Sequence, residues 1–163
     1  MATKKPAAPK APATKPTPII RRARSDDAAA MSLLIQEYVT VGTLLPRPPE
    51  FIVERTLDFL VATVRGRVVG CAHLEEYSPS LAELRSLVVD PAYQGQGVGV
   101  ALVAEIEALA ARRDYPIIFA VSNNEAFFLA RGYTPRQIPE LDRERSAVSK
   151  FKGVFAKDLQ PPK

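Results

Sequence analysis

Apolar and polar positions follow two periods along this chain, one typical of helices and one typical of strands. Met31, Leu34, Ile35 and Tyr38 recur at helical spacing on one face of the first predicted helix. Helices are predicted over residues 25–39, 50–56, 98–113 and 124–131. Strands are predicted over residues 19–23, 59–64, 68–75, 82–89 and 117–121. This order of strands and helices predicts an α/β (α+β) domain.

A strand, a glycine-rich loop and a helix follow one another without a gap in the middle of the chain. The strand stops at Asp90-Pro91, and the loop Gln94-Gly95-Gln96-Gly97-Val98-Gly99 leads into the helix. Glycines let a loop backbone approach a ligand closely, and the free amides and dipole of a first helical turn favour an anion. The arrangement predicts a loop that binds phosphate or pyrophosphate. A tight turn without a ligand is the alternative.

Two common phosphate-binding motifs do not fit this loop. A P-loop ends in Gly-Lys-Ser/Thr, whereas Val100 and Ala101 follow Gly99. The dinucleotide fingerprint has two residues between its second and third glycines, whereas only Val98 separates Gly97 from Gly99. The spacing therefore indicates a different phosphate ligand.

The segment Val89–Gly99 resembles the coenzyme A signature of the GCN5-related N-acetyltransferases (GNAT), which reads Gln/Arg-x-x-Gly-x-Gly/Ala after a strand. The resemblance implies the GNAT fold, a central mixed and mostly antiparallel sheet flanked by helices. It also implies acetyl-CoA as co-substrate, with its pyrophosphate on the loop amides and its pantetheine arm paired with the preceding strand. The residues that it places at the cofactor are Leu87, Val88, Val89, Gln94, Gly95, Gln96, Gly97, Val98, Gly99 and Asn124. For Asn124, capping of the following helix is the alternative role.

Four further segments narrow the resemblance to the N-acetylglutamate synthases. Gly42–Ile52 is similar to their Gly-x-Leu-Leu-x-Arg-x-x-Glu segment, and residues 70–74 look like their Gly-Cys-Ala-x-Leu strand. Residues 127–135 resemble their aromatic-Phe-x-x-x-Gly-Phe motif, and residues 145–159 their closing Arg-x-Ser-Lys and Asp-Leu elements. The resemblance implies acetylation of the α-amino group of L-glutamate, the first step of arginine biosynthesis. It implies a short, stand-alone form without the amino-acid kinase domain of many members.

Two features depart from common patterns. Most members of the superfamily have a tyrosine four residues before the glycine of the last motif, whereas this chain has Phe128, which has no proton to donate. The synthase branch shares this phenylalanine. The spacing from Arg145 to Ser149-Lys150 is longer than the family's, and Leu141-Asp142 stands where Tyr-Asn is usual.

The resemblance assigns catalytic roles to two residues. An α-ammonium group must lose a proton before it attacks a thioester, and Glu83 at the start of the central strand is the expected base. An exposed strand carboxylate, or an ion-pair partner of Arg85, is the alternative for Glu83. Ser122 is the expected donor to the departing thiolate, and strand amides near Leu87 are expected to stabilise the oxyanion.

Binding of a dicarboxylic amino acid requires cations, and a guanidinium suits a carboxylate because it forms two parallel hydrogen bonds. Arg47 lies in a proline-rich loop and matches the family's glutamate-binding arginine. A solvated loop arginine is the alternative. Arg145, Ser149 and Lys150 are the other expected contacts of the acceptor.

Composition limits the other possibilities. The chain has 163 residues, 47% of them hydrophobic, which suffices for one domain with a core. No apolar stretch approaches the roughly 20 residues of a membrane span, and the N-terminus lacks the apolar centre of a secretory signal. With one cysteine, Cys71, and one histidine, His73, we expect no disulfide and no metal site, and a core position for both. A cytoplasmic location is expected.

The net charge of +4 is located in the first 18 residues, which contain four lysines and no acidic residue. The remaining residues have 18 basic and 18 acidic side chains. We expect residues 1–18 to be a disordered tail and residues 19–160 to form the acetyltransferase domain. The tail predicts at most weak, salt-sensitive binding to nucleic acid. A homodimer, another small amine as acceptor, and a coenzyme A-binding regulator without turnover stay open as alternatives.

Overall fold

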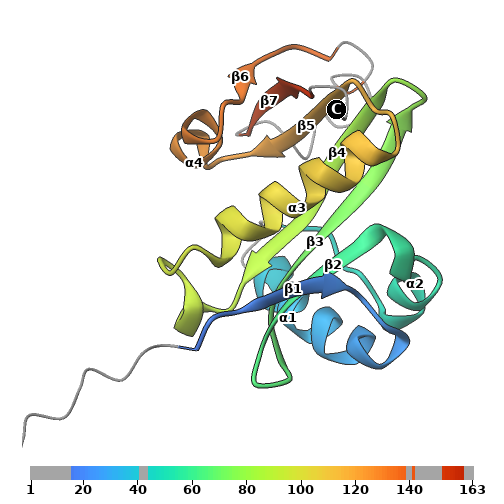
Figure 1. Cartoon of the computed structure of the whole chain (residues 1–163), viewed down its shortest axis with the longest axis vertical. Coiled ribbons are helices and arrows are strands. Elements are labelled where there is room, and N and C mark those ends of the chain that lie inside the picture. The colour runs from blue at the N-terminus through green and yellow to red at the C-terminus, as the bar shows by residue number, and fades with distance from the viewer. Residues whose placement is uncertain (1–15, 41–43, 139–140, 142–151, 160–163) are drawn as a thin grey trace, which may run out of the picture.

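The computed structural model describes residues 16–40, 44–138, 141 and 152–159. Within these residues, seven strands form one sheet in the order β1-β2-β3-β4-β5-β7-β6. Neighbouring strands are antiparallel except β4 and β5, which are parallel. The sheet is therefore mixed and mostly antiparallel, and this confirms the fold class expected from the sequence (Figure 1).

The helices and strands follow the predicted order. The strands are β1 (Ile19–Arg22), β2 (Phe59–Val64), β3 (Arg67–Ser78), β4 (Leu81–Val89), β5 (Ile117–Ser122), β6 (Thr134–Pro135) and β7 (Gly153–Asp158). The α-helices are α1 (Ala28–Thr40), α2 (Pro49–Val53), α3 (Val98–Arg112) and α4 (Glu125–Ala130). Short 3-10 turns are η1 (Ser25–Asp27), η2 (Thr56–Asp58) and η3 (Pro91–Tyr93). The expected tail lies outside the described residues, apart from residues 16–18.

Helices cover both faces of the sheet (Figure 1). On one face, α3 buries Leu102 and Ile106 against apolar side chains of β2, β3 and β4. On the other face, α1 buries Met31 and Ile35, together with Ile52 of α2. Since both faces are buried, β2 is buried at every position, and five of its six residues are apolar, with Thr63 as the exception.

The C-terminal strand β7 is an element that the periodicity did not predict. It inserts between β5 and β6, and Ser122 of β5 lies opposite Gly153 of β7. This pairing brings Lys152, just before β7, close to the end of β5. It also places Lys157 and Asp158 of the C-terminal segment in a strand that is one position from the edge of the sheet.

β4 has one extra residue, Ser86, relative to β3. As a result, the side chains after Ser86 point to the opposite sheet face from the one that regular alternation would give them. Ser86 has a φ of 51°, and the register between β3 and β4 shifts at this point. Leu84, before the bulge, packs on the α3 side, and so does Leu87 after it, whereas Val88 packs on the α1 side. The bulge therefore lets Glu83 and Leu87, both odd-numbered, point to opposite faces of one strand.

The parallel pairing between β4 and β5 is short. It joins Leu81, Ala82 and Glu83 to Ile117, Ile118 and Phe119, and β4 continues to Val89 without it. Beyond Glu83, one edge of β4 is therefore open, while the other edge stays bonded to β3.

Among the described residues, no helix has the length and apolar character that crossing a bilayer requires.

Cys71 and His73 occupy the core, as the sequence predicted. The Cys71 side chain is fully buried, and burial raises the pKa of its thiol to about 12. The His73 ring stacks on Phe59 with centroids 4.2 Å apart, and among the described residues its Nδ1 atom has no hydrogen-bond partner. Burial lowers the pKa of His73 from 6.5 to about 4.

The buried His73 makes stability depend on pH. In the unfolded chain the imidazole binds a proton as the pH falls through 6.5, but in the folded chain it does so only near pH 4. We expect the free energy of unfolding to fall by about 2 kcal/mol between about pH 7.5 and pH 5. Urea titrations at both pH values test this. His73→Gln, which removes the chain's one histidine, should flatten the dependence, and an equal slope in the variant would contradict it.

Candidate functional site

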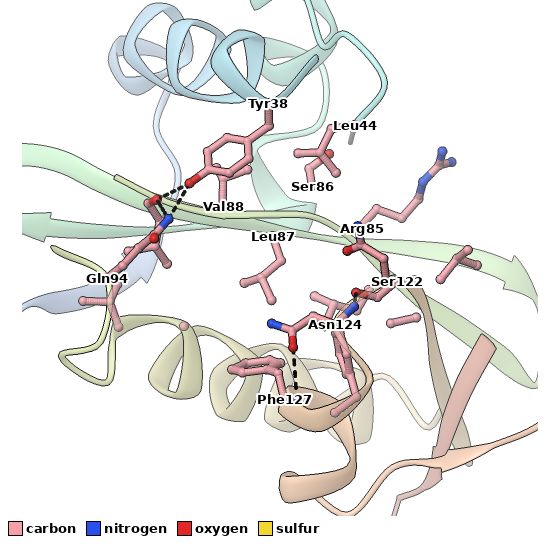
Figure 2. A pocket seen from close by; sticks show the side chains of 18 of the residues that line it. Tyr38, Leu44, Arg85, Ser86, Leu87, Val88, Gln94, Ser122, Asn124 and Phe127 are labelled. Atoms are coloured by element: carbon pink, nitrogen blue, oxygen red, sulfur yellow. Dashed lines mark hydrogen bonds between the residues drawn. The ribbon is translucent and has the colours of Figure 1, made fainter. Parts of the chain in front are cut away.

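A cavity of about 680 Å³ opens where β4 and β5 separate. One wall is the open edge of β4 from Leu84 to Val89, and the opposite wall is residues 120–124 with Phe127 and Phe128. The glycine loop and the start of α3 close one end (Figure 2). Glu83, at the other end of the open edge of β4, also lines the cavity, and so does Arg47. The cavity thus joins the two regions that the sequence had singled out separately.

The glycine loop has a backbone geometry that requires glycine at two positions. Gly95 and Gly97 have φ angles of 73° and 85°, in the left-handed region that favours glycine. Gly97 is the N-cap of α3, and its carbonyl accepts the hydrogen bond of Ala101 N. The preceding amides of the first turn, from Val98 to Val100, therefore have no acceptor within the helix, and these three residues line the cavity. This end of the cavity favours an anionic group.

The open edge of β4 can pair with an extended ligand. Its amide and carbonyl groups from Leu84 onward lack a partner strand on the β5 side, and an extended chain carrying amides can add to such an edge. Leu87 points across the cavity toward Asn124 and Phe127 (Figure 2). Val88 packs its side chain into the α1-side core, so it reaches the cavity mainly with its backbone.

The wall formed by β5 and α4 is held by two short hydrogen bonds. Ser122 Oγ accepts from Asn124 N at 3.0 Å, and Asn124 Oδ1 accepts from Phe127 N at 3.3 Å. The second bond is the N-cap of α4, so the capping role considered for Asn124 is present. The amide nitrogen of the same side chain points into the cavity (Figure 2). Because the side-chain oxygen of Asn124 makes the cap, its amide nitrogen is left to donate a hydrogen bond to a ligand in the cavity.

Glu83 is buried, with 2% of its surface exposed, and lines the cavity. The alternative of an exposed strand carboxylate is therefore wrong for this residue. Glu75 lies directly opposite on β3, and Arg85 contacts both, with its Nη1 2.6 Å from Glu75 Oε2 and its Nε 3.8 Å from Glu83 Oε1. Burial by itself raises the pKa of Glu75, but the Arg85 hydrogen bond and nearby cations hold it below its ordinary value. Arg85 is thus shared by two carboxylates and is closer to Glu75.

Arg47 is held at the cavity by its backbone and by an aromatic ring. Ser32 Oγ of α1 donates to the Arg47 carbonyl at 2.6 Å. The Arg47 guanidinium lies 4.7 Å from the centre of the Phe51 ring, and Arg55 stacks on the same ring at 3.8 Å. Only Arg47 of these two lines the cavity. Arg47 is therefore placed as a cation at the cavity wall, and the alternative of a merely solvated loop side chain does not describe it.

The other predicted site residues fall into two groups. Gln96 lies in the loop, but its side chain donates to the Ala92 carbonyl at 3.1 Å and does not line the cavity. Arg145, Ser149 and Lys150 lie outside the described residues. The structure brings the remaining predicted residues together around one cavity.

Lys152 and Tyr38 are two polar residues among those of the cavity that the sequence did not predict as site residues. Lys152, just before β7, is half-buried, and burial lowers the pKa of its ammonium group. Tyr38 was predicted only as an apolar face residue, yet its hydroxyl reaches Val89 and Gln94 (Figure 2). No local sequence pattern marks either residue as part of the cavity. Tyr38 comes from α1 and Lys152 from the segment before β7, and both are far in sequence from β4 and β5.

Within the described part of the chain, no group of three or more His, Cys, Asp or Glu side chains is arranged to hold a metal ion.

The comparisons with known proteins agree with this geometry. A family model described as an acetyltransferase (GNAT) domain matches residues 55–135. An uncharacterised N-acetyltransferase of Chlorobaculum tepidum is 37% identical over 70% of this chain and 74% of its own length. An amino-acid acetyltransferase of Mycobacterium tuberculosis is 32% identical over 72% of this chain and 68% of its own.

A solved structure adds a likeness in three dimensions. N-acetylglutamate synthase from Neisseria gonorrhoeae, in complex with coenzyme A and N-acetyl-glutamate, is similar with a TM-score of 0.81 and 27% identity. The similarity covers 90% of this chain but 36% of that synthase. This chain therefore corresponds to about a third of that protein.

The positive φ of Gly97 makes a test of the loop possible. Replacement by valine should distort the loop, since a β-branched side chain is strained at φ 85°, and should raise the dissociation constant of CoA about tenfold or more. Gly66→Val is the matched control, because Gly66 in the β2–β3 turn has a φ of 77° and equally open surroundings but does not line the cavity. Calorimetric titration of CoA into both variants gives the comparison. Unchanged CoA affinity in a folded Gly97→Val protein would remove the loop from the binding site.

Proposed function

Because this chain belongs to the GNAT acetyltransferase family, we propose that it transfers the acetyl group of acetyl-CoA to the α-amino group of L-glutamate. It is an acetyl-CoA-dependent N-acetyltransferase, and glutamate as its acceptor is the proposed part. The observation that carries the proposal is a cavity that has an anion-favouring loop at one end and a buried carboxylate and a cation on its wall. The amino-acid acetyltransferases among its relatives support an amino acid as the acceptor.

Acetyl-CoA would lie along the length of the cavity. The pyrophosphate of acetyl-CoA would bind the amides of Val98, Gly99 and Val100, and the pantetheine amides would pair with the open edge of β4 near Leu87. Asn124 would donate to the pantetheine arm from the opposite wall. The thioester would then lie near the point where β4 and β5 meet, beside Glu83.

Acyl transfer requires a neutral amine. Glu83, buried at the cavity wall, would accept a proton from the α-ammonium group, directly or through water. The freed nitrogen attacks the thioester carbon, a C–N bond forms and the C–S bond breaks. The oxyanion that forms in between needs donors, which the backbone amides of β4 near Leu87 would supply.

The departing thiolate needs a proton, and Phe128 has none to give. Phe128 is buried against Tyr133 and Phe155, so its role at this position is packing. Ser122 accepts from Asn124 N, and its own hydroxyl proton stays available for donation to the cavity that it lines. Ser122 is therefore the proposed proton donor to the thiolate. It would regain a proton from the attacking nitrogen, directly or through water, because that nitrogen loses its second proton as the amide forms.

Two cations on the cavity wall would recognise the acceptor. Arg47 comes from the loop between α1 and α2, and Lys152 from the segment before β7, on the side of Ser122. Two carboxylates in a partly desolvated cavity need two such partners, whereas an amino acid with a neutral side chain needs one. This pairing favours a dicarboxylic amino acid over another small amine.

Release of free CoA thiol tests the proposal directly. The full chain is incubated with acetyl-CoA and each of the common amino acids, and the product with glutamate is identified by mass spectrometry. Glutamate should give the highest kcat/KM. If a polyamine or a neutral amino acid gave a higher kcat/KM than glutamate, glutamate would be wrong as the acceptor. The acetyltransferase activity itself would not be contradicted.

Replacement of the proposed base should change both rate and pH dependence. Glu83→Gln should lower kcat roughly 100-fold, and most severely at low pH, because solvent is then a poor substitute for the base. Glu75→Gln is the matched control, since Glu75 shares Arg85 but does not line the cavity. The pH–rate profiles of both variants and the parent give the answer. A profile of unchanged shape in Glu83→Gln would make Glu83 a structural residue.

Removal of either proposed acceptor cation should damage glutamate binding selectively. Arg47→Ala should cost roughly 2 to 4 kcal/mol of transition-state binding, which is about 30- to 1000-fold in kcat/KM for glutamate. Arg47→Lys should recover only part, because an ammonium group cannot form two parallel bonds. Lys152→Gln should lower kcat/KM with glutamate more than with glutamine, which lacks the side-chain charge.

Arg55→Ala is the control for these variants, because Arg55 stacks on the same Phe51 ring outside the cavity. The KM for acetyl-CoA should stay close to that of the parent in all of them. Equal damage to both substrates would indicate a disturbed loop, and equal losses with glutamate and glutamine would remove Lys152 from the acceptor site.

A further inference from the structure

Three polar groups form a closed hydrogen-bonded triangle between α1, the end of β4 and the glycine loop. Tyr38 Oη donates to the Val89 carbonyl at 2.7 Å and accepts from Gln94 Nε2 at 2.6 Å. Gln94 Nε2 also donates to the same Val89 carbonyl at 3.1 Å. Figure 2 shows Tyr38 and Gln94 together at one end of the cavity, with dashed lines for these bonds. Each member contacts the other two, so the triangle fixes the position of all three.

The triangle occupies the last carbonyl of β4. Asp90 N donates to Val69 on β3, so the Val89 carbonyl points to the opposite, open side of the strand. A carbonyl oxygen has two lone pairs, and Tyr38 and Gln94 use both. A ligand that pairs with the edge of β4 therefore finds this oxygen already bonded. The triangle of Tyr38, Val89 and Gln94 forms a clamp, and this clamp marks the point where pairing of a ligand with β4 ends and the glycine loop begins.

Gln94 is the residue next to the first glycine of the loop. Gly95 and Gly97 have many accessible conformations in a free chain, and the loop between them is exposed to solvent. Such a loop loses conformational entropy when it becomes ordered around a ligand. A side chain bonded at the loop's first residue lowers that cost, because the loop then starts from a fixed point.

Tyr38 is well suited to be that fixed point. It sits on α1, whose buried face packs against the sheet through Met31 and Ile35. Burial raises the pKa of the Tyr38 hydroxyl, so the group keeps its proton and stays a donor at neutral pH. Ser32, earlier on the same helix, bonds the Arg47 carbonyl. One rigid helix therefore holds both the cofactor loop and the acceptor loop.

We propose that Tyr38 is a positioning residue for the pyrophosphate of acetyl-CoA, which fixes the glycine loop through Gln94 and Val89. It touches the loop and the strand, and acts on the cofactor through them. The inference rests on the binding of the pyrophosphate by the loop, and it is independent of which amine is acetylated.

Tyr38→Phe tests the role while keeping the ring in place. The KM for acetyl-CoA and the dissociation constant of CoA should rise roughly 3- to 10-fold, because both hydrogen bonds of the hydroxyl are lost while the direct bond from Gln94 to Val89 stays. The kcat should stay within about twofold of the parent. With S-acetylpantetheine, which lacks the pyrophosphate, the loss in kcat/KM should be several-fold smaller. Gln94→Leu should have a similar effect, and the double variant should be no worse than either single one.

Tyr115→Phe is the control, because the Tyr115 hydroxyl also bonds a single side chain, Glu76, away from the loop. It should leave both constants unchanged. Equal losses with acetyl-CoA and S-acetylpantetheine, or additive losses in the double variant, would overturn the proposal. The titration of CoA needs no acceptor amine. It therefore tests the role of Tyr38 even if glutamate proves not to be the substrate. If Gly97→Val also left CoA affinity unchanged, the loop assignment itself would fail, and not the clamp alone.

Discussion

The separation of β4 from β5 after Glu83 is the constraint on which the rest of this structure depends. A parallel pair normally continues along both strands, but here it ends after Leu81–Glu83 and Ile117–Phe119. The open edge of β4 leaves backbone donors and acceptors without a strand partner, which is costly unless water or a ligand bonds them. The same separation creates the cavity of about 680 Å³. A ligand that carries amides can complete the sheet, and the pantetheine arm of acetyl-CoA has that chemistry.

The bulge at Ser86 directs the odd-numbered side chains of the two halves of β4 to opposite faces of the sheet. Before it, Glu83 points to the face that carries Arg85 and Glu75, where charged groups gather. After it, Leu87 points to the face shared with Asn124 and Phe127 (Figure 2). A regular strand would direct both odd-numbered side chains to one face. One inserted residue therefore separates the proposed proton transfer from the proposed cofactor binding along a single strand.

Helix α1 connects the two ends of the cavity. Its buried face anchors it to the sheet, and its polar residues Ser32 and Tyr38 reach the loops on either side. Arg47 and the glycine loop both belong to segments with few apolar anchors of their own. Hydrogen bonds from this helix help to fix both segments, together with the contact of Arg47 with the Phe51 ring and the bond from Gln94 to Val89. Such contacts with a packed helix let exposed loops hold a site precisely enough for acyl transfer.

Local patterns in the sequence determined most of the elements and the glycine loop. The order of helices and strands, the left-handed Gly95 and Gly97, and the buried Cys71 and His73 all follow from period, glycine placement and polarity, which act between near neighbours. The tertiary structure alone decided the burial of Glu83, the bulge at Ser86, the insertion of β7 that brings Lys152 to the cavity, and the clamp of Tyr38 on Val89 and Gln94. Tyr38 and Gln94 are 56 residues apart. No local period encodes such a contact, because it depends on how α1 packs on the sheet.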